Sequence, residues 1–127
     1  MDSKDTMDKS SPRKEKRRCP RISMDFPLEY RVVDAPDARG GIVVDGSKRG
    51  LRIHSIENIP VGTKLKIAVI FPKEFQMTNF EVTAEIIWKD LCLREDWSGF
   101  QYGLKFILIR KGDLRKLKEL LGEQYQT

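Results

Sequence analysis

FEVTAEIIW at residues 80–88 and FQYGLKFIL at residues 100–108 show the clearest strand pattern in the chain. In both stretches an apolar side chain returns at every second position, which is the period of a β-strand with one buried face. A charged segment, residues 94–98, separates them. We therefore predict two strands that pair as a long hairpin, with Trp88 on the buried face as a core residue.

Four shorter apolar stretches upstream are also expected to be strands. They comprise residues 26–32, 42–44, 51–55 and 65–71. Gly40 and Gly41 precede the second of them and suit a turn that needs positive φ. A compact polar break at residues 45–47 separates the second stretch from the third.

The C-terminal segment has the spacing of a short amphipathic helix. Asp113 is placed to cap its N-terminus, and leucines then recur at positions 114, 117, 120 and 121. The helix is expected to pack over the barrel or against a partner, and pairing with a second copy stays open. Because closure removes exposed strand edges, six short strands before one helix favour a mainly β fold, a six-stranded antiparallel β-barrel with a C-terminal α-helix.

The length of 127 residues suits a single domain. Residues 1–16 are charged or polar with almost no apolar side chains, so we expect a disordered basic N-terminal tail. Residues 17–125 are expected to form the barrel domain with its helix. Lys and Arg outnumber Asp and Glu by 24 to 19, and the excess is concentrated between Arg13 and Arg21. This distribution favours a negatively charged partner.

Little in the sequence indicates an enzyme. His54 is the only histidine and is expected to be an outward-facing strand residue, while Cys19 and Cys92 belong to no CxxC pair. No GxxxxGK[ST] phosphate loop is present. The longest wholly apolar run, residues 67–71, is far shorter than the roughly 20 residues that cross a bilayer, and the N-terminus has no apolar signal core. We therefore expect a cytoplasmic protein without catalytic activity, cofactor, metal or membrane insertion.

Two clusters depart from the strand pattern: RRCPR at residues 17–21, before the first strand, and DGSKRG at residues 45–50, between the second and the third. They resemble the RxxxR and [D/N]xSxxG motifs of the PilZ domain family. The matching positions are Arg17 and Arg21 for the first motif and Asp45, Ser47 and Gly50 for the second. Residues 84–88 and 102–106 are similar to the closing strands of that family, so the resemblance spans residues 15–122.

The resemblance implies a PilZ-like split barrel that binds the bacterial second messenger cyclic di-GMP, which has two guanines and two phosphates. A guanidinium group can pair with guanine O6 and N7, clamp a phosphate or lie flat on a base, whereas lysine lacks this planar fork. We predict that Arg17 and Arg21 approach the ligand from different directions. Arg18 is expected to be a supporting contact that either stacks or points away.

The second motif is expected to form the other side of the ligand site. Asp45 can accept hydrogen bonds from guanine N1–H and N2–H or hold an arginine in place, and the Ser47 hydroxyl can bond a base or a phosphate. Gly50 lacks a Cβ, so the backbone can approach the ligand there. The sequence does not show which ligand contacts are made by Asp45 and which by Ser47.

The predicted function is a cyclic di-GMP receptor that changes conformation on binding and regulates a downstream protein in motility, exopolysaccharide production or secretion. One alternative is a small barrel that binds single-stranded nucleic acid through its basic arm. Such proteins expose aromatic side chains, whereas the strand aromatics here fall in register on the predicted buried face. The other alternative is a PilZ adaptor that acts only through protein contacts, and the intact motifs count against it.

Overall fold

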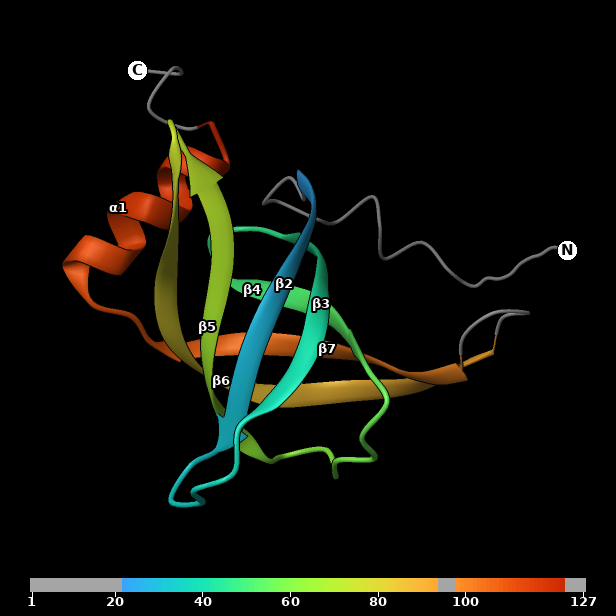
Figure 1. Cartoon of the computed structure of the whole chain (residues 1–127). Helices are drawn as coiled ribbons and strands as arrows, with labels where there is room; N and C mark the ends of the chain where they lie inside the picture. Colours follow the sequence, from blue (N-terminus) through green and yellow to red (C-terminus); the bar gives the residue numbers. More distant parts are fainter. Residues whose placement is uncertain (1–21, 94–97, 123–127) are drawn as a thin grey trace, which may run out of the picture.

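Six antiparallel strands close into a barrel in the computed structural model, which describes residues 22–93 and 98–122 (Figure 1). The strands are β2 (Ile22–Val32), β3 (Arg39–Gly46), β4 (Gly50–Ser55), β5 (Lys64–Lys73), β6 (Gln76–Leu93) and β7 (Ser98–Leu108). The helix α1 (Lys111–Leu120) follows them. Around the ring the order is β2-β3-β4-β7-β6-β5, so the first strand pairs with both β3 and β5. The predicted fold, mainly β with a C-terminal helix, is confirmed.

Alternate residues of the strands point inward and fill the barrel, as the period of two predicts. The buried side chains on this inner face include Leu28, Tyr30, Val43, Leu51, Ile53, Leu65, Ile67, Val69, Phe80, Val82, Ala84, Ile86, Tyr102 and Leu104. Phe71 contacts both Phe26 and Phe80, with ring centroids 6.2 and 6.1 Å apart in tilted orientations. The apolar alternation of the sequence therefore locates most of the core.

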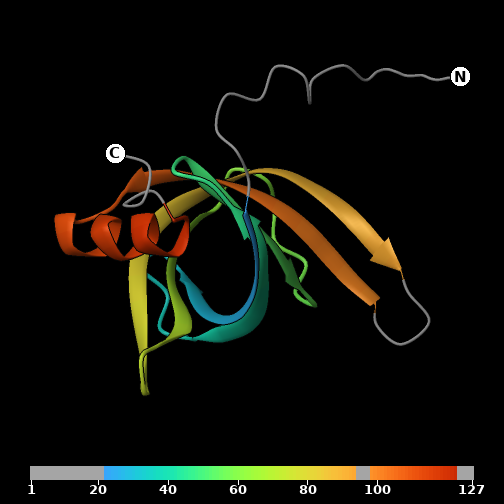
Figure 2. The same cartoon turned by 90° about the horizontal axis from the view of Figure 1, so that it is seen from above.

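The predicted long hairpin is present and extends beyond the barrel (Figure 2). Strands β6 and β7 pair from Thr83 with Leu108 to Leu93 with Ser98. A β-bulge lies between Ile86 and Trp88, and such a bulge places two residues opposite one and reverses the alternation beyond it. Trp88 is consequently 38% exposed, so the prediction that it belongs to the core is wrong.

The predicted turn at Gly40 and Gly41 is also wrong, because both glycines lie within β3. Positive φ occurs earlier, at Asp34, where φ is 72°. Gly41 is instead required by close packing, since a Cβ there would lie 2.8 Å from the backbone oxygen of His54 on β4. His54 itself is half-buried in β4, and its ring Nε2 lies 3.1 Å from Gln101 Nε2 on β7.

Helix α1 packs against β6, so of the two packing modes left open the structure shows the one in which the helix covers the barrel. Leu117 and Leu121 are buried, and Leu114 and Leu120 are half-buried against the core. Asp113 does not cap the helix, which already begins at Lys111. Its Oδ1 atom instead accepts a hydrogen bond from the backbone N–H of Glu81, at 2.9 Å, and so ties the helix to β6.

Two buried tyrosines hydrogen-bond inside the fold. The hydroxyl groups of Tyr30 and Ser55 lie 2.7 Å apart, while Tyr102 Oη accepts from the backbone N–H of Ile59, at 2.8 Å, and donates to the backbone oxygen of Glu57. Burial raises the pKa of Tyr30 and of Tyr102 above the ordinary value of 10.0, because the charged phenolate is poorly solvated there. The folded protein therefore favours the neutral phenols.

This preference predicts a loss of stability in alkali. The contribution is fully present below about pH 10, where both states carry neutral phenols, and is lost as the pH rises through the folded pKa values. We expect the free energy of unfolding, measured with urea at a series of pH values, to fall more steeply above about pH 10 in the wild type than in the variant Tyr30→Phe/Tyr102→Phe. Parallel curves for the two proteins would contradict this prediction.

Candidate functional site

The DGSKRG segment forms the connection from β3 to β4 and is closed by its own hydrogen bonds. The backbone N–H of Ser47 donates to the oxygen of Gly50 at 2.9 Å, and Ser47 Oγ accepts from the backbone N–H of Arg49 at 3.1 Å. Ser47 is only 2% exposed. The serine hydroxyl therefore shapes the turn, a common role of serine in tight connections, whereas its contact with a ligand stays a prediction.

Asp45, at the end of β3, forms an ion pair with Arg52 on β4. The two residues are register partners across the hairpin, and Arg52 Nη2 donates to Asp45 Oδ2. The Asp45 side chain is 10% exposed and that of Arg52 is 39% exposed. The carboxylate of Asp45 thus orients Arg52, and its contact with a ligand stays a prediction. Arg52 is a residue that sequence reasoning missed, although its position mirrors Asp45 across the turn.

Gly50 begins β4 at a point where the strand lies very close to β7. A Cβ on Gly50 would lie 2.0 Å from the backbone oxygen of Leu104, and one on Gly46 would lie 2.6 Å from Leu51 Cδ2. The missing side chain of Gly50 therefore accommodates the neighbouring strand. The approach of a ligand to Gly50, for which we predicted the glycine, stays a prediction.

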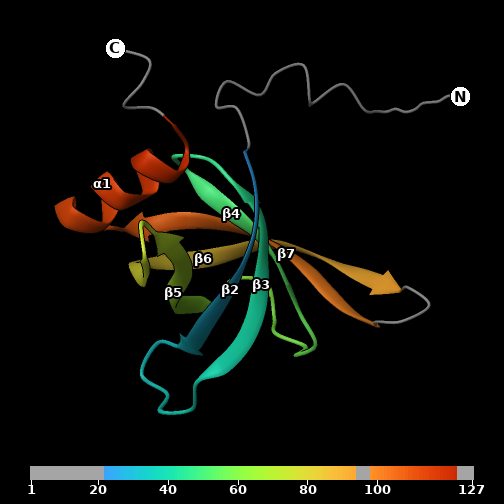
Figure 3. The ribbon, with the colours of Figure 1, turned by 45° about the horizontal axis from the view of Figure 1, so that its top comes forward.

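The chain enters the barrel beside this turn. Ile22, the first residue of β2, pairs with Gly46, and Ser23 pairs with Asp45. Figure 3 shows β2 and β3 side by side. Arg21 directly precedes Ile22 in the sequence. The three predicted arginines, Arg17, Arg18 and Arg21, lie outside the described residues, as does the tail at residues 1–16.

The pairing of the strands continues from Asp45 across the outside of the barrel to an exposed aromatic side chain. Arg52 pairs with Gly103 on β7, and Gly103 pairs with Trp88 on β6. The indole packs directly on Gly103, because a Cβ there would lie 2.0 Å from Trp88 Nε1. An ion pair and an aromatic ring thus lie in one row on the outer face. The β-bulge that creates this row has no signal in the alternation of the sequence.

Gly103→Ala is expected to displace the indole of Trp88, since the ring is the far end of a side chain that can move. The cost should be about 1–3 kcal/mol of stability, typical of an overpacked contact. In a Trp97→Phe background the fluorescence of Trp88 should shift to the red and become easier to quench. Gly112→Ala is the matched control, because nothing lies within 4 Å of a Cβ at that position. Unchanged fluorescence in Gly103→Ala would show that the indole does not pack on Gly103.

The surroundings of the turn are basic. Lys48 and Arg49 are exposed within it, and exposed Lys105 pairs with Gly50 from β7. Within the turn the carboxylate of Asp45 is matched by Arg52, and Glu85 on β6 pairs in register with Lys105. Such a surface attracts phosphates or other anions.

Residues 22–93 and 98–122 contain no cluster of three or more His, Cys, Asp or Glu side chains that could hold a metal ion. In the same part of the chain, no helix is long and apolar enough to cross a bilayer. The turn and the row of residues beside it contain guanidinium, ammonium, hydroxyl and indole groups.

The sequence model of the PilZ domain matches residues 15–123. The chain belongs to the PilZ domain family. The resemblance drawn from the two motifs is therefore confirmed, and the matched range includes both of them. No curated protein sequence matches the chain.

Several solved structures share the fold of this PilZ domain. The PilZ domain of YcgR from Escherichia coli, described with c-di-GMP, has a TM-score of 0.63 and 14% identity over 87% of this chain and 92% of that one. MotI/DgrA, the inhibitor of motility of Bacillus subtilis, has a TM-score of 0.66 and 14% identity over 88% of this chain and 52% of that one. MrkH of K. pneumonia in its apo state has a TM-score of 0.63 and 14% identity over 93% of this chain and 52% of that one. The chain thus spans about half the length of MotI and MrkH, and at this identity the likeness establishes the fold.

Proposed function

We propose that this PilZ domain is a receptor for cyclic di-GMP that regulates a downstream protein and catalyses no reaction itself. The observation that carries the proposal is the pairing of Ile22 with Gly46. It brings the start of β2, which directly follows the RxxxR motif in the sequence, to the turn that contains the [D/N]xSxxG motif. In our proposal the two motifs, which are separated in the sequence, meet at this turn.

The length of the intervening chain supports this proposal. Arg21 is bonded to Ile22, so their Cα atoms are about 3.8 Å apart, and Arg17 is separated from Ile22 by at most about 18 Å of extended chain. Both guanidinium groups can therefore reach a dinucleotide that rests on the turn. In our proposal one arginine pairs with a guanine edge and the other with a phosphate, while Arg18 gives a supporting contact.

The described residues supply the other side of the site. Arg52 is oriented by Asp45, so its guanidinium is fixed before any ligand arrives. Trp88, which is 38% exposed, lies in the same row, and in our proposal a base stacks on its indole. Lys105 and the exposed side chains of the turn favour the phosphates. We propose that these groups, together with Ser47 and Gly50, form the floor on which the nucleotide rests.

The solved relatives support the choice of ligand. The YcgR domain is described with c-di-GMP, and MrkH is described in a c-di-GMP complex, at a TM-score of 0.52. We propose that binding here draws Arg17 and Arg21 over the nucleotide and so changes the surface beside β2. A partner protein in motility, exopolysaccharide production or secretion would respond to that change.

Calorimetric titration tests the proposal. Cyclic di-GMP should bind with a micromolar or lower Kd, about −8 kcal/mol or better, and GTP or cyclic di-AMP should bind far more weakly. Equal binding of all three nucleotides would show that the interaction is only non-specific attraction between opposite charges. Binding of single-stranded DNA that disappears at modest salt would indicate the nucleic-acid alternative instead. If none of these ligands binds, the result would favour the alternative of a PilZ adaptor that acts only through protein contacts.

A further inference from the structure

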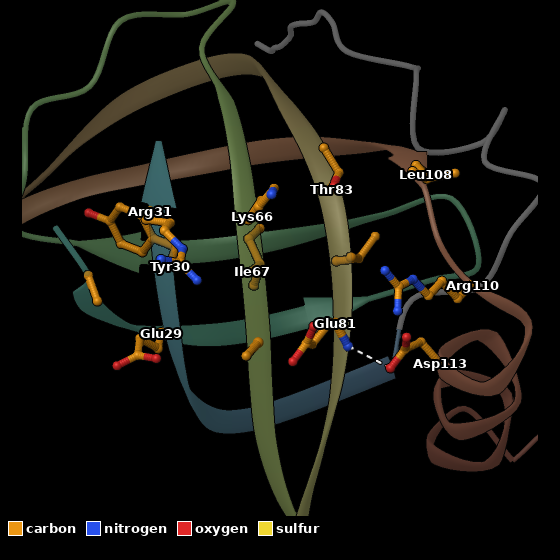
Figure 4. A pocket seen from close by; sticks show the side chains of 13 residues that line it. Glu29, Tyr30, Arg31, Lys66, Ile67, Glu81, Thr83, Leu108, Arg110 and Asp113 are labelled. Atoms are coloured by element: carbon orange, nitrogen blue, oxygen red, sulfur yellow. Dashed lines mark hydrogen bonds between the residues drawn. The ribbon is translucent and has the colours of Figure 1, made fainter. Parts of the chain in front are cut away.

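A pocket of about 370 Å³ lies on the outer face of the barrel (Figure 4). Its floor is formed by β2, β5 and β6, and one wall by Leu108 at the end of β7, Arg110, and Asp113 in the first turn of α1. The volume is within the range of small-molecule sites, about 300–1,000 Å³. None of the motif residues Asp45, Ser47 and Gly50 lines it. Its lining residue Glu29 is seven positions along β2 from Ile22, the residue that pairs with Gly46 of the turn.

The charged side chains on the floor of the pocket lie in two rows, one acidic and one basic. In one row Glu29 on β2 and Glu81 on β6 both pair with Ala68 on β5, whose methyl group leaves space between them. In the next row on the same face, Arg31 pairs with Lys66. Residues two positions apart along a strand are about 6.7 Å apart, so the acidic row and the basic row are separated by this distance.

The wall beside α1 contributes one more charge of each sign. Arg110 and Asp113 both line the pocket. Asp113 is held in place by the backbone N–H of Glu81 at 2.9 Å (Figure 4). This hydrogen bond joins the wall to the floor, so the shape of the pocket depends on the docking of the helix.

The opposite charges of the pocket form no ion pairs with one another among the residues that the structure describes. Among the residues that the structure describes, the ion pairs are Arg39–Glu57, Arg52–Asp45 and Lys73–Glu119, and none of them involves a residue of the pocket. Carboxylates and basic groups thus face one hollow while staying apart. A ligand with a single sign of charge would be attracted by one row and repelled by the other, whereas a ligand with both signs would be attracted by both.

We propose that this pocket binds a small zwitterionic molecule, with its ammonium group toward Glu29, Glu81 and Asp113 and its carboxylate toward Arg31, Lys66 and Arg110. A nucleotide is excluded by the acidic row, and a polyamine by the basic row. The site is independent of the proposed cyclic di-GMP site, with which it shares none of the described motif residues.

The probe for this proposal is 6-aminohexanoate, whose two charges lie at the ends of a chain long enough to span the two rows. Hexylamine and hexanoate are matched controls of nearly equal length that keep only one charge. In ¹⁵N–¹H spectra of the full chain, 6-aminohexanoate should cause saturable shifts at β5, β6 and the start of α1, with a Kd in the millimolar range. Each control should bind at least about tenfold more weakly, or about 1.4 kcal/mol.

Lys66→Gln and Glu81→Gln should each weaken binding of 6-aminohexanoate at least about fivefold, or about 1 kcal/mol. Lys64→Gln is the matched control, because Lys64 lies on the same strand but does not line the pocket. Cyclic di-GMP titrations of the two pocket variants should match the wild type, which separates this proposal from the other. Shifts that do not saturate, equal binding of hexanoate or hexylamine, or equal losses in Lys64→Gln would overturn it.

Discussion

Alanine at both Arg17 and Arg21 is expected to weaken cyclic di-GMP binding at least hundredfold, or about 2.8 kcal/mol, and each single substitution at least tenfold, or about 1.4 kcal/mol. The large effect has a physical reason. Each guanidinium would make paired hydrogen bonds to a guanine edge or a phosphate, and its removal leaves those ligand groups without partners in a partly dehydrated site. Calorimetric titration of the two single variants and the double variant measures these losses.

Two control variants separate a ligand clamp from a merely basic arm. Arg13→Ala removes a positive charge outside the motif and should change the Kd less than about twofold. Arg21→Lys keeps the charge but loses the planar fork, so it should bind nearly as poorly as Arg21→Ala. Equal losses in Arg13→Ala and Arg21→Ala, or full binding by Arg21→Lys, would show that the interaction is electrostatic and that the proposed clamp does not exist.

The described side of the site is held in place without any ligand. The bonds within the turn fix Ser47 against Gly50 and Arg49, and the backbone oxygen of Arg49 accepts from the N–H of Phe106 at 2.9 Å. The turn is thereby anchored to β7 as well as to its own hairpin. A preformed floor lowers the entropy lost on binding. In our proposal it is therefore the chain before β2 that changes conformation when the ligand binds.

The fold was predictable from the sequence because each strand buries one face. Apolar residues therefore recur at every second position of the strand. The same rule fails where pairing departs from regular geometry. The bulge before Trp88 adds one residue on β6 and turns the indole outward, yet the alternation of residues 80–88 continues unchanged. Gly41 misled for a similar reason, since glycine serves close strand packing as well as turns.

The candidate site was predictable only in part. Asp45, Ser47 and Gly50 are found in one turn because a short motif folds locally. Arg52 and Trp88 come to the same face through strand register, which depends on the whole barrel. Family motifs identify residues with a shared sequence pattern, whereas these two residues are recognised only once the neighbouring strands are placed.

Gly50→Ala is expected to lower the free energy of unfolding by at least about 3 kcal/mol. The added Cβ would lie 2.0 Å from the backbone oxygen of Leu104, and neither strand has a flexible side chain to move aside at that contact. Relief would require β4 and β7 to separate, at the cost of hydrogen bonds around the register of Gly50 with Lys105. Urea unfolding followed by circular dichroism measures the change.

Gly40→Ala is the matched control, because Gly40 also lies in a barrel strand and nothing lies within 4 Å of a Cβ there. It should change stability by less than about 1 kcal/mol. The comparison also separates two reasons for a glycine in the motif. If Gly50→Ala kept the stability of the wild type and lost only cyclic di-GMP binding, the glycine would serve the ligand. A loss of stability in the absence of any ligand would instead show that the last glycine of the motif holds the barrel together, and that the ligand site depends on it indirectly.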